Sequence, residues 1–305
     1  MEGTYTEVVV GVDGSAPSRA ALRWAAAEAG RRALPLRIRL AYHWRVPGTR
    51  FASSAQLERA AQELAELTVH DAVAEATAAS PGLAVSGEVV LGDASWVLMS
   101  VLHPTALAVV GSHGHNDVSA TLLGSVGLQL ATCAPCPVMV VRGRSNAITG
   151  PVLVGVDGSP AAERALGVAF EQAASRGSDL LVVRAFRPPE PPWLDSVRRA
   201  YYRPGAVEDQ LLADLHHSVE PWHGTFPRVR AECRVVVGRP GAVLVDRSRH
   251  AALVVVGSRG HGGFAGLLLG SVSHHLLHRG ECTVLVVPEP CRVGLTEGSS
   301  EGKSL

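Results

Sequence analysis

The sequence predicts a tandem α/β protein, in which two similar domains each contain a buried parallel sheet and intervening helices. Short apolar runs rich in β-branched residues alternate with longer alanine-rich segments, and this alternation is typical of βαβ units. The chain has 305 residues, and its first half recurs in its second half. Because a domain usually has 100 to 150 residues, a duplicated domain explains the length.

The internal repeat is visible near the start, the middle and the end of each copy. The segment VVVGVDGSAPSRAAL returns as VLVGVDGSPAAERAL, LAVVGSHGH returns as LVVVGSRGH, and CPVMVVR returns as CTVLVVP. Asp13 and Asp157 lie 144 positions apart, whereas Gly111 and Gly257 lie 146 positions apart. The second copy has therefore gained only two residues between these motifs.

Turn-forming residues set the predicted domain limits at 1–146 and 147–294. The boundary falls in the segment GRSNAITG, which separates the last apolar run of the first copy from the first apolar run of the second. The end of the chain, residues 295–305, is rich in Gly, Ser and Glu. We expect this end to be a disordered tail.

The strands and helices of each copy follow from local patterns. In the first copy we expect strands at residues 8–12, 36–41, 87–90, 106–110 and 138–141. Ser15 or Ser18 can cap the first helix, and Pro17 suits a helix start because its missing N–H would be unpaired there. In the second copy the proline-rich segment 187–193 predicts an extended loop before a helix resumes near Ala206. That loop follows the second strand, so it could form a lid, a partner surface or a simple surface variation.

Composition and charge exclude several functional classes. Hydrophobic residues make up 47% of the chain and charged residues 18%, and the formal net charge is zero. This balance argues against a binder of nucleic acid driven by phosphate attraction. Lys303 is the only lysine, so mechanisms that need a phosphate-bound or Schiff-base lysine are excluded. We expect a cytoplasmic protein without a membrane span, because no apolar run is long enough and the five cysteines form no plausible disulfide framework.

A glycine loop with the spacing G-x2-G-x9-G-S follows the fourth expected strand of each copy. It comprises Gly111, Gly114, Gly124 and Ser125 in the first copy, and Gly257, Gly260, Gly270 and Ser271 in the second. Each loop leads into an expected helix, so backbone N–H groups and a helix N-terminus would form an anion site. A purely structural turn is the alternative for one such loop, but the identical spacing in both copies favours binding.

An aspartate closes the first expected strand of each copy. Asp13 and Asp157 both precede a Gly-Ser pair, and their carboxylates could bind ribose, adenine or a metal. The alternative role is that of an N-cap for the following helix. His113 and Arg259 are possible auxiliaries for phosphate, because the chain lacks a nearby lysine.

The motifs V-G-V-D-G-S and G-x2-G-x9-G-S resemble those of the universal stress protein family in its ATP-binding branch, and the resemblance spans both copies. It implies a Rossmann-like sheet of the adenine nucleotide alpha-hydrolase type, with five parallel strands in the order 3-2-1-4-5 and helices on both faces. A nucleotide would then sit at the switch point between strands one and four. The resemblance also implies that the copies pair about a pseudo-twofold axis through their last strands, residues 138–141 and 284–287.

The family pattern, carried over by position, assigns the nucleotide contacts of both copies. In the first copy they are Gly11, Val12, Asp13, Ala41, Gly111, Gly114, Gly124, Ser125 and Val126. In the second copy they are Gly155, Val156, Asp157, Val183, Gly257, Gly260, Gly270, Ser271, Val272 and Ser273.

The two copies depart from this pattern unequally. The hydroxyl that follows the loop is present as Ser273 but is replaced by Gly127 in the first copy. The first loop also carries Asp117 where the second has glycine, and a carboxylate near phosphate oxygens would repel them unless a metal intervened. We therefore predict that the second copy binds ATP at least as tightly as the first.

Other motifs suggest weaker alternatives. Cys133 and Cys136 have the C-x2-C spacing of zinc sites, but further ligands are lacking, so we expect both to pack beneath the final strand. His274 and His278 have i, i+4 spacing, yet we favour a partly exposed helix face, as no carboxylate pattern accompanies them. The five tryptophans form no repeated stripe and are expected to serve packing.

The resulting functional hypothesis is an ATP-binding regulator of stress response or dormancy that uses ATP with Mg²⁺. Its output would be a nucleotide-dependent conformation or a regulatory protein partner, and a homodimer remains open. The alternatives are a slow ATP hydrolase or adenylyl-transferring enzyme and a nucleotide-free scaffold. The missing lysine disfavours the enzyme, and the intact glycine spacing disfavours the scaffold.

Overall fold

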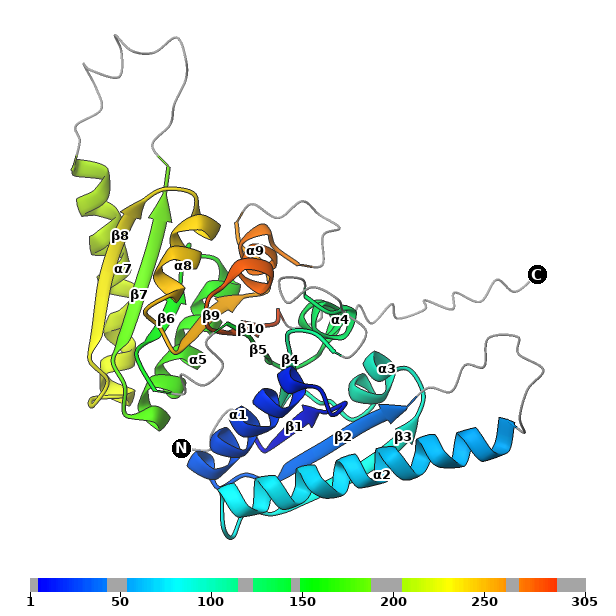
Figure 1. The fold of residues 1–305 in the computed structure, drawn as a ribbon. Coiled ribbons are helices and arrows are strands. Elements are labelled where there is room, and N and C mark those ends of the chain that lie inside the picture. The colour runs from blue at the N-terminus through cyan, green and yellow to red at the C-terminus, as the bar shows by residue number, and fades with distance from the viewer. Residues whose placement is uncertain are drawn as a thin grey trace, which may run out of the picture.

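The strands of both copies form one continuous ten-stranded sheet (Figure 1). The computed structural model describes residues 5–42, 54–114, 123–143, 149–187, 205–261 and 269–289. The sheet order is β3-β2-β1-β4-β5-β10-β9-β6-β7-β8. Each copy thus has its strands in the order 3-2-1-4-5, and the predicted fold class and topology are confirmed.

The strands are short and mostly buried. Those of the first copy are β1 (Glu7–Gly11), β2 (Leu36–Tyr42), β3 (Val85–Leu91), β4 (Ala106–Gly111) and β5 (Val138–Val141). Those of the second are β6 (Val152–Gly155), β7 (Leu180–Phe186), β8 (Ala231–Val237), β9 (Leu253–Gly257) and β10 (Thr283–Val287). The five predicted strands of the first copy are all present. Val12 lies just beyond β1, although its N–H still donates to the carbonyl oxygen of Arg39 at 2.9 Å.

Helices cover both faces of the sheet. Those of the first copy are α1 (Ala16–Arg32), α2 (Ser54–Ala79), α3 (Ala94–Met99) and α4 (Ser125–Cys133). Those of the second are α5 (Pro160–Arg176), α7 (Ala206–Thr225), α8 (Pro240–Ser248) and α9 (Ser271–Arg279). Side chains of α1, α2, α5 and α7 belong to one apolar core, and those of α3, α4, α8 and α9 belong to the other. None of the described helices is both long and apolar enough to be a membrane-spanning segment.

Serine caps begin the first helix of each copy. The Ser15 hydroxyl accepts a hydrogen bond from the N–H of Ser18 at 3.3 Å, and that of Ser159 accepts from Ala162 at 3.2 Å. Ser15 is therefore the cap, and Ser18 is not. Helix α7 begins at Ala206, as predicted. The chain from residue 188 to residue 204, which includes all but the first residue of the proline-rich segment 187–193, lies outside the described residues.

The two copies join through their last strands, as the family resemblance implies. β5 and β10 pair antiparallel, with Val138 opposite Val286 and Val140 opposite Val284. All nine residues of these two strands are buried. The pairing covers two strand edges that would otherwise be free to aggregate.

Arg142 extends this contact beyond the sheet. Its guanidinium donates hydrogen bonds to the carbonyl oxygens of Leu276 (3.0 Å), Leu277 and His278 (2.9 Å) in the last turn of α9. The carbonyls of Leu277 and His278 have no partner in their own helix, whereas that of Leu276 also accepts the N–H of Gly280 at 2.7 Å. The negative end of the helix dipole favours a cation there. The corresponding residue of the second copy is Pro288, which cannot make the reciprocal contact. Arg142 therefore ties the first copy to α9 in one direction only.

A buried charge cluster ties α1 to α5 on the other side of the junction. The Glu28 carboxylate accepts hydrogen bonds from Arg31 (2.6 Å), Arg32 (2.8 Å), Gln172 (2.8 Å) and Arg176 (2.9 Å). Burial alone would raise the pKa of Glu28, but the three guanidinium groups, Arg176 first, outweigh it and lower the pKa to about 2.

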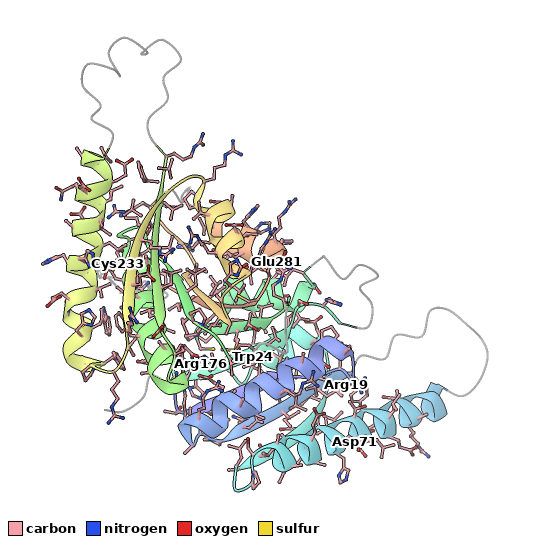
Figure 2. All side chains as sticks on the ribbon, turned by 60° about the vertical axis from the view of Figure 1, so that its left-hand side comes forward. Arg19, Trp24, Asp71, Arg176, Cys233 and Glu281 are labelled. Carbon is pink, nitrogen blue, oxygen red and sulfur yellow. The ribbon has the colours of Figure 1, made fainter. Side chains whose placement is uncertain are left out.

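The apolar surroundings complete the cluster. Trp24 is fully buried, and the guanidinium carbon of Arg176 lies 5.1 Å from the centre of the Trp24 ring, so the cation also packs on an aromatic face. Figure 2 shows both residues where the two copies meet. A low pKa means that Glu28 stays ionised in the folded protein at any pH above about 2.

We predict that Glu28→Gln destabilises the protein by about 3 to 5 kcal/mol, because it leaves buried guanidinium groups without their counter-charge. Urea denaturation at pH 7 measures this change. Glu75→Gln is a matched control, since its ion pair with Arg23 is exposed and exposed pairs contribute about 0 to 1 kcal/mol.

The same variant makes a prediction for pH. The folded-state pKa of Glu28 is depressed, so its stabilising effect is present above its usual pKa of 4.5 and is lost as pH falls toward about 2. The difference between wild type and Glu28→Gln should therefore shrink as the pH is lowered through this window. If Glu28→Gln and Glu75→Gln lower the free energy of unfolding equally at pH 7, the Glu28 cluster does not stabilise the junction.

Candidate functional site

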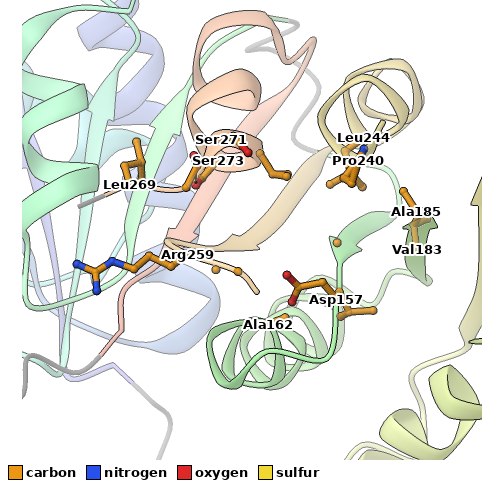
Figure 3. Close-up of a pocket in the computed structure, with 16 residues that line it drawn as sticks. Asp157, Ala162, Val183, Ala185, Pro240, Leu244, Arg259, Leu269, Ser271 and Ser273 are labelled. Carbon is orange, nitrogen blue, oxygen red and sulfur yellow. Dashed lines mark hydrogen bonds between the residues drawn. The ribbon is translucent and has the colours of Figure 1, made fainter. Parts of the chain in front are cut away.

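A pocket of about 450 Å³ lies in the second copy at the carboxyl ends of β6, β7 and β9 (Figure 3). This place is the switch point of the sheet, because β6 pairs with β7 on one side and with β9 on the other. The volume is within the range of small-molecule sites, about 300 to 1,000 Å³.

Every nucleotide contact predicted for the second copy lines this pocket. The strand ends contribute Gly155, Val156, Asp157 and Val183, and the loop and helix contribute Gly257, Gly260, Gly270, Ser271, Val272 and Ser273. Figure 3 shows Asp157 on one side of the opening and the serines of α9 across from it. The repeat and the loop spacing thus predicted residues that lie far apart in sequence but close together in space.

Apolar residues that the sequence reasoning missed complete the wall. They are Ala162, Ala185, Pro240, Leu244 and Leu269. Pro240 and Leu244 lie on α8 at i, i+4 spacing, and this periodicity is the signal that could have identified them. Arg259, considered only as an auxiliary, also lines the pocket.

The strand register corrects one pair of assigned positions. Gly11 pairs with Arg39 in the first copy, whereas Gly155 pairs with Val183 in the second. Val183 therefore corresponds to Arg39, and the true counterpart of Ala41 is Ala185. The carbonyl of Val183 already accepts the N–H of Val156 at 3.0 Å. Applying the repeat distance of 144 residues to Ala41 would have revealed the mismatch.

Asp157 links two loops that face each other across the pocket. Its Oδ1 accepts the N–H of Ser159 at 3.0 Å, and its Oδ2 accepts the N–H of His261 at 3.0 Å. Partial burial raises its pKa, but the hydrogen bonds from Ser159 and His261 outweigh this effect and hold the pKa of Asp157 below its usual value. The carboxylate is thus ionised at neutral pH. The alternative role as a helix N-cap is wrong, because Ser159 is the cap.

The N-terminus of α9 opens toward the pocket without a side-chain cap. Gly270 is the capping residue and makes no side-chain hydrogen bond, and His274 donates the first intrahelical bond to Gly270 at 3.0 Å. The N–H groups of Ser271, Val272 and Ser273 therefore have no partner within the helix. Together with the positive end of the helix dipole they form an anion-binding arrangement.

Ser273 has a structural role in this arrangement. Its side chain is buried, and its Oγ lies 3.1 Å from the carbonyl oxygens of Ser258 and Gly270. The hydroxyl proton is thus directed at the loop backbone and holds the loop against α9. Gly127 occupies this position in the first copy and cannot form such a bond.

The first two glycines of each loop are required by close packing. A Cβ on Gly257 would lie 2.9 Å from the carbonyl carbon and oxygen of Ala161, and one on Gly111 would lie 2.8 Å from the carbonyl carbon of Pro17. A Cβ on Gly260 would collide with Oδ2 of Asp157. These glycines are thus explained by packing, and it is the N-terminus of α9 that provides the anion-binding groups.

The first copy has the same backbone frame. β1 pairs with both β2 and β4, which brings Gly11, Val12 and Asp13 next to Gly111 and Gly114. Helix α4 begins at Ser125 and Val126 after Gly124, whose N–H donates to Ser112 at 2.7 Å, as the N–H of Gly270 donates to Ser258 at 2.7 Å. Ala41 lies near the end of β2.

Besides Gly127 in place of Ser273, two differences separate the first site from the second. Asp13 is exposed, whereas Asp157 is partly buried. His113 stands where the second loop has Arg259, and its Nδ1 lies 2.9 Å from the hydroxyl of Ser112. Asp117, which we expected to weaken phosphate binding, lies outside the described residues.

The other sequence candidates have structural explanations. Cys136 is buried, as expected, and burial raises the pKa of its thiol to about 12, but Cys133 is exposed at the end of α4, so that half of the prediction is wrong. His274 is exposed and His278 partly exposed, as predicted, and the rings lie 4.2 Å apart. Within the described part of the chain, no three His, Cys, Asp or Glu side chains are grouped as metal ligands. Trp24 is buried and Trp96 is 65% exposed.

The fold and the pocket define a class of protein. Its members have two doubly wound α/β domains in tandem, and a helix N-terminus suited to binding an anion lies at the switch point of the sheet. The family model described as the universal stress protein family matches residues 4–142 and 149–288. The chain belongs to this family.

Individual relatives agree with this assignment over nearly the whole chain. A universal stress protein of Mycobacterium tuberculosis is 35% identical over 292 residues, which cover 92% of this chain and 96% of the relative. One from Mycolicibacterium smegmatis is 34% identical, with 94% and 98% covered. The crystal structure of a universal stress protein from Archaeoglobus fulgidus has 19% identity and a TM-score of 0.70, with 95% and 99% covered, and it supports the fold alone.

We predict that Gly257→Ala lowers stability by about 1 to 3 kcal/mol, because the added methyl group would overlap the backbone of Ala161. Thermal unfolding without any added ligand measures this effect. Gly224→Ala in α7 is the control, since nothing lies within 4 Å of its added Cβ and alanine favours a helix, so it should be neutral or slightly stabilising. Similar melting temperatures for both variants would contradict the packing role of Gly257.

Proposed function

We propose that this universal stress protein is an ATP-binding regulator and that its second copy provides the tighter site. The observation that carries this proposal is the 450 Å³ pocket at the switch point, which is lined by all ten positions assigned to the second copy. The output would be a change of conformation or of partner binding rather than a chemical product.

The pocket's chemistry fits the three parts of an adenine nucleotide. Ala185, Pro240 and Leu244 offer an apolar wall for the adenine ring. The uncapped N-terminus of α9 offers N–H donors to the phosphates, and Arg259 adds a cation at the rim. Asp157 is the carboxylate of the lining, so it would bind ribose or take part in holding Mg²⁺, whose other ligands would be phosphate oxygens and water.

The groups around the pocket favour binding over hydrolysis. Among the described residues that line the pocket, Asp157 is the only one with a carboxylate, and its lowered pKa makes it a weak general base. Both of its oxygens already accept backbone N–H groups. The described lining contains no lysine to offset charge on a transferred phosphoryl group, and Lys303, the only lysine of the chain, lies outside the described residues.

Removing the two aspartates separately tests which copy binds. We predict that Asp157→Ala weakens the tighter ATP-binding event by about tenfold or more, which corresponds to about 1.4 kcal/mol. Asp13→Ala should weaken only the weaker event. Isothermal titration with ATP and Mg²⁺ measures both, and Asp179→Ala, an exposed residue before β7, serves as the control. Loss of binding in Asp13→Ala alone would contradict the proposed order of affinities.

A second measurement separates binding from catalysis. Purified protein incubated with ATP and Mg²⁺ should release ADP at a rate close to that of the buffer alone over several hours. ADP release that exceeds this background and disappears in Asp157→Ala would instead identify a hydrolase that uses the same pocket.

A further inference from the structure

A second hollow of the second copy, about 260 Å³ in volume, lies away from the nucleotide pocket. Its floor is apolar and is formed by Pro151, Leu153, Leu181 and Ala251. These residues lie at or just before the first residues of strands β6, β7 and β9, so the hollow is at the amino ends of these strands. The nucleotide pocket is at their carboxyl ends.

Three basic side chains surround this floor: Arg234, Arg247 and His250. Arg234 donates through Nε to the carboxylate of Glu232 at 2.6 Å, which leaves both of its terminal nitrogens available. In the part of the chain that the structure describes, no side-chain hydrogen bond or ion pair joins Arg247 or His250 to another residue. The hollow therefore combines an apolar floor with two guanidinium groups, those of Arg234 and Arg247, that lack a full set of hydrogen-bond partners among the described residues.

The first copy shows what occupies the same corner when it is closed. There the Glu7 carboxylate is buried, with its oxygens 3.3 Å from Nη1 of Arg37 and one of them 2.8 Å from Nε2 of His103. Glu7 immediately precedes Val8 of the repeat, as Pro151 precedes Val152. In the first copy the Glu7 carboxylate thus binds the Arg37 and His103 side chains. The second copy has Pro151 at the position of Glu7 and provides no such carboxylate there.

The strand registers confirm these equivalent positions. Val9 pairs with Arg37 and Leu153 with Leu181, so Leu181 replaces Arg37. Arg39 pairs with Glu88 and Val183 with Arg234, so an arginine replaces a glutamate on the neighbouring edge strand. At this corner the second copy has therefore lost the carboxylates of Glu7 and Glu88, gained that of Glu232 where the first copy has Ser86, and gained an apolar floor and Arg234.

We propose that this hollow binds a small-molecule carboxylate that carries a short apolar chain. The ligand's carboxylate would take the place of the Glu7 carboxylate and accept hydrogen bonds from the guanidinium groups of Arg234 and Arg247, which suit carboxylates in planar, bidentate geometry. Its apolar chain would lie on Leu153 and Leu181. The small volume favours a free metabolite of a few carbon atoms over a protein segment.

A ligand series on the unmodified protein tests both features of this site. Hexanoate, hexanamide and acetate are titrated against the full chain labelled with ¹⁵N, and the amide shifts of Leu153, Leu181 and His250 are followed. Hexanoate should bind at least about tenfold more tightly than hexanamide, which lacks the charge, and than acetate, which lacks the chain. Equal affinity for hexanoate and hexanamide would overturn the proposal.

Variants then locate the binding. Pro151→Glu combined with Leu181→Arg restores the residues of the first copy and should abolish hexanoate binding, because an internal carboxylate occupies the corner. Arg247→Met should weaken hexanoate binding about tenfold or more, whereas Arg239→Met, an exposed arginine beyond the carboxyl end of β8 and outside the lining, should leave it unchanged. Equal weakening by Arg247→Met and Arg239→Met would overturn the assignment.

Two further outcomes distinguish this site from its alternatives. ATP affinity should be unchanged in Arg247→Met, because the nucleotide pocket is at the other end of the strands, so failure of one site does not imply failure of the other. N-acetyl-leucine represents the carboxyl end of a protein chain. If it binds more tightly than hexanoate, the hollow is a site for a protein C-terminus and the proposed metabolite is wrong.

Discussion

The antiparallel pairing of β5 with β10 is the constraint on which the rest of the molecule depends. It joins two five-stranded sheets into one and covers an edge strand of each copy. Because the pairing is antiparallel, the copies are related by a pseudo-twofold rotation, which brings α1 beside α5 on one face. The Glu28 cluster can form only there, since its carboxylate comes from α1 and Gln172 and Arg176 come from α5. A buried carboxylate with three guanidinium partners in turn favours this one orientation over others.

Duplication has preserved the backbone of the site and changed the side chains around it. In both copies an aspartate follows the first strand, a glycine-rich loop follows the fourth, and a helix begins without a side-chain cap. Close contacts explain this conservation between the copies, since a methyl group on Gly111 or Gly257 would enter the backbone of the first helix. Positions where a side chain does not enter the backbone of the first helix have diverged, as Gly127 and Ser273 or His113 and Arg259 show. The frame is therefore fixed by packing, while the electrostatic properties of each site were free to differ.

Much of the fold and of the second site could be predicted because both depend on patterns that recur in the sequence. Strand order, the joining strands and the ten lining positions all follow from the repeat and its resemblance to a known family. The pair Ala41 and Val183 is mismatched because the strand register places Val183 opposite Gly155, where the first copy has Arg39 opposite Gly11. Glu28 could not be predicted as a buried charge, since its partners Gln172 and Arg176 are more than 140 residues away. Cys133 could not be separated from Cys136 either, because the C-x2-C spacing does not show that Cys133 ends α4 on an exposed position while Cys136 is buried before β5.

The second site is the better organised of the two, because side chains without a counterpart at helix α4 hold both ends of helix α9. At the N-terminus of α9, the Ser273 hydroxyl holds the loop against the helix, in addition to the Gly270 N–H bond that has its counterpart at Gly124 in the first copy. At its C-terminus, Arg142 from the first copy binds three carbonyl oxygens. Helix α4 has Gly127 in place of the serine, and Pro288 in place of the arginine leaves no equivalent partner from the second copy. A helix held at both ends loses less conformational freedom when an anion binds at its N-terminus. The organisation of the second site therefore depends on a side chain of the first copy, which is a physical reason for the two domains to remain on one chain.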